Sequence, residues 1–369
     1  MSSWTAFRGN GARTGLTAGP TLCDPPDLAW TRSLGEGIVA SPVAAGGRVY
    51  VVGKLGLVAA FDREGETPSL PGWPARVAGT VASTPLLFGG RLYVATLEGA
   101  ICAFDAETGQ SVAQVADLGG IEASLAADEE SGQVVAVTQQ GMAFGFDRDL
   151  APRWRFPDRG ERTVAGGFRA SPAVAEGALV AVSESGEVVV LDQASGHVHE
   201  RWRAWAPGEV LATPVIARGF VCVLTKGAEL TTYRLGDGRI HARGACHGAA
   251  FVAASPALIA ADRAILVFGS ADGRVHAIDY LSGRSEPLFP LDPGFPASEP
   301  MVSSPAAAGG LAVLGTDAGH LLAVDAAKAR VAWSLPLAGP IRSSPALDGD
   351  RLYVCTEDGT LYAFSPAAG

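Results

Sequence analysis

Short apolar runs separated by turns recur along the whole chain. The stretches GGRVYVVG, GGRLYVAT and GDRLYVCT alternate their residues with the period of two that is typical of a β-strand. A turn that ends in glycine comes next, as in LEG, ESG and EDG, and a further apolar run then ends in aspartate, as in GAICAFD and GEVVVLD. The pattern predicts strand after strand joined by tight turns.

These strands belong to a repeat. A Ser/Thr-Pro pair opens each copy, and the steps between successive pairs run from 40 to 49 residues. The pairs are Ser41-Pro42, Thr84-Pro85, Ser171-Pro172, Thr213-Pro214, Ser255-Pro256, Ser304-Pro305 and Ser344-Pro345, and Ser124-Leu125 is a degenerate eighth copy. Repeats of this length are typical of solenoids and propellers.

A glycine holds the same place in the second turn of almost every copy. It stands six residues before the end of the third strand in seven copies, as Gly56, Gly99, Gly141, Gly186, Gly273, Gly319 and Gly359, and only Ala228 departs from the rule. Glycine adopts a positive φ without steric cost, so we expect a left-handed backbone conformation there.

A fourth apolar segment follows the aspartate, often with a tryptophan. Trp73, Trp154, Trp202 and Trp333 lie 7 to 11 residues after the ends of their third strands. Eight units of four short strands predict an all-β fold, an eight-bladed β-propeller of four-stranded antiparallel blades. A closed ring also removes the exposed edge strands that a solenoid would leave.

The last repeat is incomplete. It starts at Ser344 and has room for only three strands, while DLAWTRSL, with Trp30, precedes the first repeat. We therefore expect this N-terminal strand to complete the last blade and close the ring. The predicted organisation is an arm over residues 1–27 that packs on a single propeller domain over residues 28–369.

Composition narrows the possible partners. The formal net charge is −10, and no cluster of Lys and Arg interrupts the acidic balance, so we expect neither nucleic acid nor a membrane surface as a partner. The start of the chain lacks the pattern of a signal peptide, which favours a cytoplasmic protein. Cys102, Cys222 and Cys355 lie in apolar runs without a CxxC pair, so we expect buried thiols and no metal site. We also expect the protein to be a monomer.

The cassette AFDAETGQ, the tryptophan after the aspartate and the opening WTAFRGNGARTG resemble the PQQ-like repeat proteins. This family includes eight-bladed quinoprotein alcohol dehydrogenases and the outer-membrane assembly lipoprotein of the BamB type, and the resemblance extends from Trp4 to the C-terminus. A quinoprotein dehydrogenase, as the resemblance implies, holds PQQ over a calcium ion and uses a pair of adjacent cysteines, a stacking tryptophan and acidic ligands. This chain has no adjacent cysteines, so we expect no cofactor, and it shows neither an export signal nor a lipidation cysteine near its start.

Polar and aromatic residues alternate in the predicted arm. Arg8, Asn10 and Arg13 could bind an anion, but they lie among the aromatic residues Trp4 and Phe7. Polar side chains in such a setting commonly satisfy buried backbone groups. We therefore expect the arm to be structural, with the aromatic side chains as plugs.

The inner strands of a propeller line a central channel, and ligand sites favour such concave mouths. We call each Ser/Thr-Pro pair, and Ser124-Leu125, an anchor. Three positions before the second residue of each anchor, the chain has Val39, Ala82, Glu122, Arg169, Leu211, Ala253, Val302 and Arg342. Five of these are apolar. Glu122 and Arg169 belong to adjacent blades and predict a salt bridge, whereas Arg342 has no acidic residue at an equivalent position. We expect Arg342 to be uncompensated, which would suit a carboxylate, phosphate or enolate ligand.

A second set of charged residues comes from the turns between second and third strands. Glu184, Lys226 and Glu357 belong to it, and we predict that they contribute to ligand binding at the mouth. His247, in GACHGAAFV, precedes the sixth inner strand and is a candidate for proton transfer, although a single histidine more often has a structural role than a catalytic one.

Two functional hypotheses remain from different classes. The first is a scaffold that binds a small anionic metabolite or a protein segment at the channel mouth. The second is a cofactor-free lyase, isomerase or cyclase, in which Arg169 and Arg342 hold an anionic substrate and Glu122 or His247 moves the proton. A PQQ-dependent dehydrogenase rests on the resemblance alone.

Overall fold

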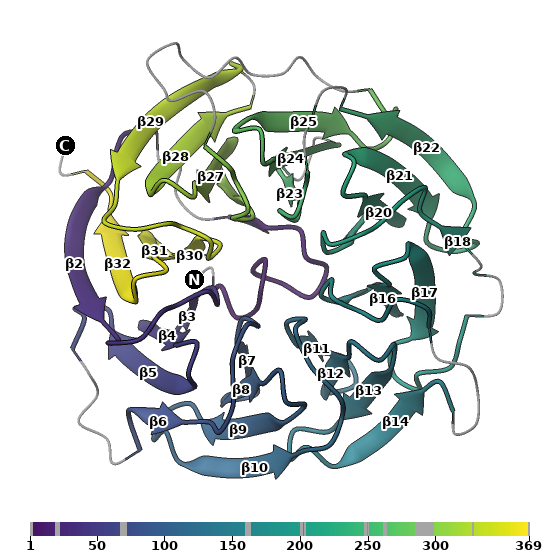
Figure 1. Cartoon of the computed structure of the whole chain (residues 1–369), viewed down its shortest axis with the longest axis horizontal. Helices are drawn as coiled ribbons and strands as arrows, with labels where there is room; N and C mark the ends of the chain where they lie inside the picture. Colours follow the sequence, from purple (N-terminus) through teal and green to yellow (C-terminus); the bar gives the residue numbers. More distant parts are fainter. Residues whose placement is uncertain are drawn as a thin grey trace.

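The computed structural model describes residues 3–18, 23–66, 72–158, 164–199, 202, 204–246, 249, 251–260, 264–284, 299–326 and 328–367. Its strands form eight antiparallel sheets arranged as blades around a central channel (Figure 1). The prediction of an all-β, eight-bladed propeller is confirmed.

Each blade begins with a short strand beside the channel. These inner strands are β3 (Val43–Ala45), β7 (Leu86–Phe88), β11 (Ala126–Asp128), β15 (Ala173–Ala175), β19 (Val215–Ala217), β23 (Ala257–Leu258), β26 (Ala306–Ala308) and β30 (Ala346–Asp348). The second strands are β4 (Arg48–Val52), β8 (Arg91–Ala95), β12 (Gln133–Val137), β16 (Ala178–Val182), β20 (Phe220–Leu224), β24 (Ile265–Gly269), β27 (Leu311–Gly315) and β31 (Arg351–Cys355). We number the blades 1 to 8 in this order.

The third strands end at the aspartates of the repeat in most blades. They are β5 (Leu57–Asp62), β9 (Ile101–Asp105), β13 (Ala143–Phe146), β17 (Glu187–Asp192), β21 (Glu229–Arg234), β25 (Val275–Asp279), β28 (His320–Asp325) and β32 (Thr360–Ser365). The outer strands are β6 (Ala75–Arg76), β10 (Ser111–Val115), β14 (Pro152–Phe156), β18 (Ala204–Trp205), β22 (Ile240–Ala245), β29 (Arg330–Pro336) and, in blade 8, β2 (Asp27–Ser33).

Two blades depart from four strands. Blade 6 shows three strands among the described residues, and the segment expected to supply its fourth, residues 285–298, lies outside them. Blade 7 has five, because β1 (Leu16–Thr17) pairs in parallel with β26. The remaining six sheets have four strands each.

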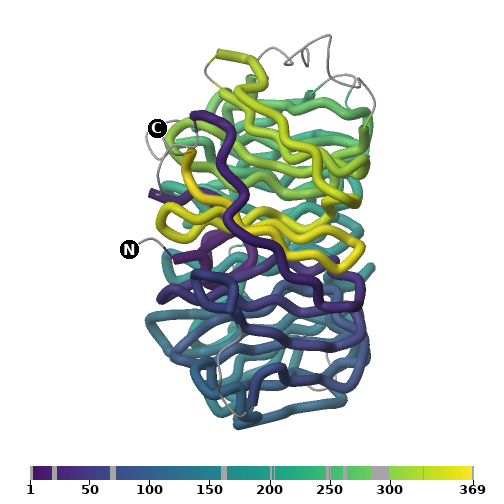
Figure 2. The backbone as a smooth tube through the Cα atoms, turned by 90° about the vertical axis from the view of Figure 1, so that its left-hand side faces the viewer, coloured from purple at the N-terminus to yellow at the C-terminus, as the bar shows by residue number. Residues whose placement is uncertain are grey.

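The two ends of the chain close the ring together. β2 pairs antiparallel with β32 from Asp27 opposite Ser365 to Ser33 opposite Thr360, so the second strand of the chain lies beside its last strand (Figure 2). Trp30 extends from β2 into the gap between blades 8 and 1. Its ring centroid lies 6.1 Å from that of Tyr353 and 6.1 Å from that of Phe61. The predicted closure by the N-terminal strand is confirmed.

The core consists of apolar layers between neighbouring blades. Trp73, for example, joins blades 1 and 2, with its ring centroid 5.8 Å from that of Tyr50 and 6.4 Å from that of Phe104. Burial of such large side chains supplies the main driving force for the fold. No helix within the described part of the chain is long and apolar enough to cross a membrane.

The glycines of the second turns adopt positive φ angles in all seven copies, between 76° and 94°. Ala228, the exception in the sequence, adopts the same conformation with a φ of 61°. The turn geometry is therefore set by the blade, and the predicted backbone conformation is confirmed.

The ring has two distinct faces. We call the side with the turns between first and second strands the hairpin face, and the side with the turns between second and third strands the mouth face. Residues 3–17, which we call the arm, cross the centre of the ring at the hairpin side (Figure 1). The channel is therefore closed at one end and open at the other.

Candidate functional site

The first residues of the Ser/Thr-Pro pairs form a closed ring of hydrogen bonds around the channel. The backbone N–H of each donates to the side-chain oxygen of the next blade's residue, over distances of 2.8 to 3.2 Å. The last bond runs from Ser344 back to Ser41 and completes the circle. The ring comprises Ser41, Thr84, Ser124, Ser171, Thr213, Ser255, Ser304 and Ser344.

This hydroxyl ring also explains the degenerate copy. Ser124 keeps its hydroxyl although leucine follows it instead of proline, and that hydroxyl accepts the N–H of Thr84 at 3.0 Å. All eight side chains are almost fully buried and all eight line the channel. Because each oxygen already accepts one hydrogen bond, its own O–H remains available as a donor toward the channel.

The arm builds the floor beneath the hydroxyl ring. Arg8 donates to the carbonyl oxygens of Pro256 and Pro305, in blades 6 and 7. Arg13 donates to the carbonyl oxygens of Pro172 at 2.8 Å and Leu125 at 2.7 Å, in blades 4 and 3. Both arginine side chains are completely buried. The prediction that these polar residues satisfy backbone groups is confirmed.

The floor carries positive charge without a countercharge from the described residues. Burial lowers the pKa of Arg13 to about 9, and burial together with the charge of Arg13 lowers that of Arg8 to about 9. Both values lie well above neutral pH, so both guanidinium groups are charged. Their hydrogen-bond acceptors are neutral carbonyl groups, and no described carboxylate pairs with either.

The space above the floor is a blind funnel. Its volume is about 330 Å³, and Phe7 lines it together with the hydroxyl ring. The rim consists of the eight residues that precede the anchors: Val39, Ala82, Glu122, Arg169, Leu211, Ala253, Val302 and Arg342. The structure thus brings together all eight positions that the repeat predicts at the mouth.

Arg169 is bound on two sides. Its Nε and Nη2 atoms donate to the two carboxylate oxygens of Glu122, each at 2.9 Å, and Nη1 lies 3.4 Å from Glu184. The predicted salt bridge between Glu122 and Arg169 is confirmed. Burial alone would raise the pKa of Glu122, but hydrogen bonds from Arg169 and Gln139 and the charge of Arg169 hold it below its usual value. Glu122 is therefore ionised near neutral pH.

The expectation of an uncompensated Arg342 is wrong. Its Nε lies 3.4 Å from Asp317 and its Nη1 lies 3.3 Å from Glu357. Both carboxylates come from second turns, Asp317 in blade 7 and Glu357 in blade 8 itself. The prediction rested on the equivalent rim positions of the other repeats, whereas the carboxylates that pair with Arg342 come from turns between second and third strands.

The other predicted site residues are spread over the mouth face. Glu184 and Glu357 contact the two rim arginines, as described above. Lys226 pairs with Glu209 at 2.8 Å and lies 5.1 Å above the ring of Phe251, and it does not line the funnel. His247 lies outside the described residues. The catalytic or ligand-binding roles of all these residues stay predictions.

Sequence reasoning missed the hydroxyl ring as a binding surface. The signal was present, because Ser or Thr recurs at all eight anchors, but the repeat identified these residues only as markers of blade starts. The closed circle depends on the distance between neighbouring blades, which no single repeat encodes.

A family model described as outer membrane protein assembly factor BamB matches residues 21–149, 126–286 and 294–369. These segments cover most of the chain. No curated protein sequence matches it significantly.

Solved structures share the fold at low sequence identity. BamB from Moraxella catarrhalis is 16% identical, with a TM-score of 0.76, over 92% of this chain and 100% of that one. A europium-containing methanol dehydrogenase is 13% identical, with a TM-score of 0.82, over 99% and 98%. Quinohemoprotein alcohol dehydrogenase from Comamonas testosteroni is 15% identical, with a TM-score of 0.75, over 100% of this chain and 81% of that one.

The funnel does not fit the quinone cofactor that the resemblance implies. The described residues of its lining include no tryptophan to stack on a quinone and no cysteine. Glu122 is the single carboxylate among these described lining residues, and it is bound to Arg169. Among the described residues no group of three His, Cys, Asp or Glu side chains could hold a metal ion. We therefore derive no chemistry through such a cofactor.

Proposed function

The chain belongs to the BamB family of PQQ-like propellers, and on this premise we propose that it is a binding propeller whose funnel takes a small anionic ligand. The observation that carries the proposal is the stack of donors on the channel axis. Eight buried hydroxyl groups that line the funnel have O–H protons to donate. Two charged guanidinium groups lie behind this lining, where they donate to the carbonyl oxygens of the residues that directly follow four of these hydroxyl groups.

Buried charge is the strongest element of this argument. A charged group removed from water is stabilised by a countercharge or by hydrogen bonds, and its field is screened little in a low-dielectric interior. Carbonyl groups accept from both Nη atoms of Arg8 and from Nε, Nη1 and Nη2 of Arg13, but Nε of Arg8 is buried without a partner and the net charge of both groups remains. An anion above the floor would supply the countercharge and accept hydrogen bonds from the hydroxyl ring.

The rim acts differently from the floor. Arg169 and Arg342 face the carboxylates of Glu122, Glu184, Asp317 and Glu357, so the rim has more negative than positive groups. These side chains are partly exposed, and solvent and salt screen them. The ligand contacts we propose therefore lie in the funnel, with the rim arginines as secondary contacts.

Native mass spectrometry and isothermal titration calorimetry test this function. The probes are inorganic phosphate, sulfate and the dicarboxylates from oxalate to glutarate, which fit a funnel of about 330 Å³. We expect the wild type to bind at least one of them. Leu211 lines the rim without forming a charged pair, and Leu211→Glu would place a negative charge at the mouth. This variant should lose the binding, because like charges repel.

Leu211→Gln is the matched control, because glutamine has nearly the shape of glutamate without its charge. It should keep the affinity of the wild type, whereas Ala253→Trp should block the funnel sterically. A wild type that binds none of the probes at millimolar concentration contradicts the proposal. Equal binding by the Glu and Gln variants at position 211 contradicts it as well.

A protein segment is the second candidate ligand, because the family description names an assembly factor. Two large apolar side chains are exposed on the mouth face, Leu55 at 63% and Phe251 at 42%. Exposed apolar side chains in a polar surround can anchor a partner. If so, capture from a lysate should recover a protein with the wild type and lose it with a Leu55→Glu/Phe251→Glu variant.

The enzyme alternative has less support. Glu122 has a lowered pKa and is held by Arg169, which makes it a weak base near neutral pH. Loss of a measured turnover in Glu122→Gln would revive this alternative. We keep the cytoplasm as the proposed location, and cell fractionation tests it.

A further inference from the structure

The two ends of the funnel carry opposite net charge. At the blind end, Arg8 and Arg13 are charged, and their described hydrogen-bond acceptors are neutral carbonyl groups. At the open end, the two rim arginines pair with a larger number of carboxylates. A ligand in the funnel is therefore exposed to a positive field from the floor and to a negative field from the rim.

The negative excess at the open end comes from two ion-pair clusters on opposite sides of the ring. Each cluster joins one guanidinium group to two carboxylates, so each has one negative charge more than positive. The clusters are Glu122, Arg169 and Glu184 in blades 3 and 4, and Asp317, Arg342 and Glu357 in blades 7 and 8. Partly exposed acids are commonly just solvated, so the rim needs an independent sign of a ligand.

The hydroxyl ring gives that sign within the same space. Its eight side chains are between 2% and 6% exposed, and all eight line the funnel. Each oxygen accepts one backbone N–H, but none of the eight O–H groups has an acceptor among the described residues. Donors without acceptors, set in front of buried positive charge, favour a carboxylate or phosphate at the blind end.

Glu122 supplies an acceptor at the open end. It lines the funnel, and 29% of its side chain is exposed. Its Oε2 accepts from Nε of Arg169 and from Gln139, whereas its Oε1 accepts from Nη2 of Arg169 alone among the described residues. A carboxylate oxygen has two lone pairs, so Oε1 can accept a further hydrogen bond. A donor on the outer end of a ligand would meet this oxygen.

The height of the funnel limits the length of the ligand. Every rim residue stands two positions before a member of the hydroxyl ring, as Glu122 does before Ser124. Two residues span at most about 7 Å. The wall between the two levels has apolar parts, which come from Phe7 of the arm and from Leu211 and Ala253 of the rim. Such a wall suits a short methylene chain.

We propose, on the basis of the anion site in the proposed function, that the ligand is a zwitterion, an ω-amino acid with its two charged groups no more than about 7 Å apart. Its carboxylate accepts from the hydroxyl ring, and its methylene chain contacts Phe7 and the apolar side of the rim. Its ammonium group donates to Oε1 of Glu122. Both ends of the funnel then attract the ligand, whereas a simple anion is attracted by the floor and repelled by the rim.

Isothermal titration calorimetry with full-length protein compares 5-aminopentanoate with pentanoate, which has the same chain without the ammonium group. We expect the wild type to bind 5-aminopentanoate at least about three-fold more tightly, as a partly exposed ion pair allows. Glu122→Gln should weaken the binding of 5-aminopentanoate and strengthen that of pentanoate, because it removes one negative charge from the rim. Loss of both affinities to the same degree would overturn the assignment.

Leu211 allows the rim charge to be changed without breaking an ion pair. Leu211→Glu should strengthen the binding of 5-aminopentanoate and weaken that of pentanoate, and Leu211→Lys should do the reverse. The ratio of the two affinities is taken within each variant, so a partial loss of folded protein does not alter the comparison. Equal ratios in the Glu and Lys variants would overturn the assignment, because the outer end of the ligand would then carry no recognised charge.

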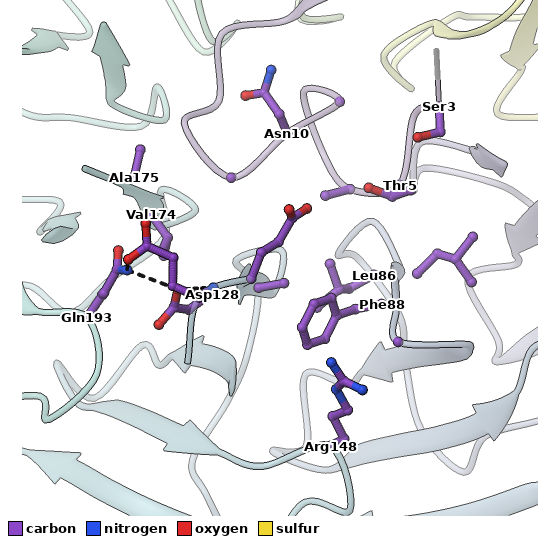
Figure 3. Close-up of a pocket in the computed structure, with 18 of the residues that line it drawn as sticks. Ser3, Thr5, Asn10, Leu86, Phe88, Asp128, Arg148, Val174, Ala175 and Gln193 are labelled. Carbon is purple, nitrogen blue, oxygen red and sulfur yellow. Dashed lines mark hydrogen bonds between the residues drawn. The ribbon is translucent and has the colours of Figure 1, made fainter. Parts of the chain in front are cut away.

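A larger cavity on the hairpin face provides the control. Its volume is about 820 Å³, the arm and the hairpins of blades 2, 3 and 4 form it, and Figure 3 shows Gln193 bonded to Asp128 in its wall. Glu129 lines this cavity and is exposed, and no member of the hydroxyl ring lines it. Glu129→Gln removes one negative charge, as Glu122→Gln does, but on the other face of the ring. It should leave both affinities unchanged, and an effect equal to that of Glu122→Gln would overturn the assignment.

The outcomes separate the nature of the ligand from the existence of the site. Equal or tighter binding of pentanoate by the wild type would overturn the zwitterion and leave the anion site in place. The same holds if neither chain binds at millimolar concentration while phosphate, sulfate or a dicarboxylate does. Absence of binding by every one of these probes would contradict the proposed function itself.

Discussion

The two ends of the central channel use arginine in opposite ways. At the closed end, Arg8 and Arg13 are completely buried and donate to backbone carbonyl groups. At the open end, Arg169 and Arg342 have 42% and 46% of their side chains exposed and pair with carboxylates. The floor thus carries buried positive charge, whereas the rim has more carboxylates than guanidinium groups.

The difference bears on the proposed ligand site. At the rim, Glu184 and Glu357 lie in partly exposed turns, and their carboxylates offset the charge of the guanidinium groups with which they pair. The carbonyl groups at the floor belong to the anchor segments of four blades, so the ring itself fixes their direction. The charge that remains available to the funnel is therefore the buried one.

The largest effect is expected from Arg13→Ala. The substitution leaves the carbonyl oxygens of Pro172, Leu125 and Phe7 without their donor and removes the side-chain hydrogen bonds from the arm to blades 3 and 4. We expect the free energy of unfolding to fall by about 3–4 kcal/mol, since each unpaired buried group costs about 1–3 kcal/mol. Thermal and urea unfolding measure it. A loss no larger than that of Arg169→Ala would refute the distinction between floor and rim.

The hydroxyl ring between the two ends should give the next effect. Thr213→Val keeps the shape of the side chain but removes the oxygen that accepts the N–H of Ser171 at 3.2 Å. The buried N–H of Ser171 then loses its partner. We expect the free energy of unfolding, measured by urea unfolding, to fall by about 1–2 kcal/mol. Thr213→Ser keeps the oxygen and serves as the control. Equal stability of the Val and Ser variants would mean that the ring bond contributes nothing.

The rim arginines should matter less for stability. Arg169→Ala and Arg342→Ala each break ion pairs between partly exposed side chains, and such pairs contribute about 0–1 kcal/mol. The two residues lie in blades 4 and 8, on opposite sides of the ring, so their effects should add in the double variant. Melting temperatures of the two single variants and the double variant test this. A loss above about 2 kcal/mol for either single variant contradicts the prediction.

The smallest effect is a pH dependence at the rim. The folded-state pKa of Glu122 lies below its ordinary value of 4.5, so the unfolded state binds the proton more readily. The stabilisation is therefore complete above pH 4.5 and is lost as the pH falls through the lowered pKa. We expect the wild type to exceed Glu122→Gln by about 0.5 kcal/mol at pH 7. This advantage should shrink below pH 4.5 in thermal unfolding across pH, and a constant difference would contradict the assignment.

Much of the fold could be predicted because it is local and repeated. Alternation in GGRVYVVG and the recurrent glycine predict strands and turns, and the missing strand after Ser344 predicts closure by the segment with Trp30. The rim positions could also be predicted, because the same offset from each anchor reaches the same height in every blade. These inferences need no knowledge of how the blades face one another.

The partners of charged groups could not be predicted in this way. Arg342 finds Asp317 from blade 7 and Glu357 from its own blade, and the sequence does not tell at what angle a turn approaches the axis. The donors of Gln193 meet Asp128 across 65 positions of the chain. Neither the pairing of the rim arginines nor the partners of Gln193 can be seen in the repeat.

The recurrent strands, their turns and the number of blades could be read from the sequence, because they follow from a pattern that each repeat carries in full. Which charges are buried, which are paired and where the channel is closed depends on how the blades assemble. Arg8 meets Pro256 and Pro305 from positions more than 240 residues away, and it is buried because the ring closes around it. Burial and partner geometry set the electrostatics of a site, and both exist only once the blades are assembled.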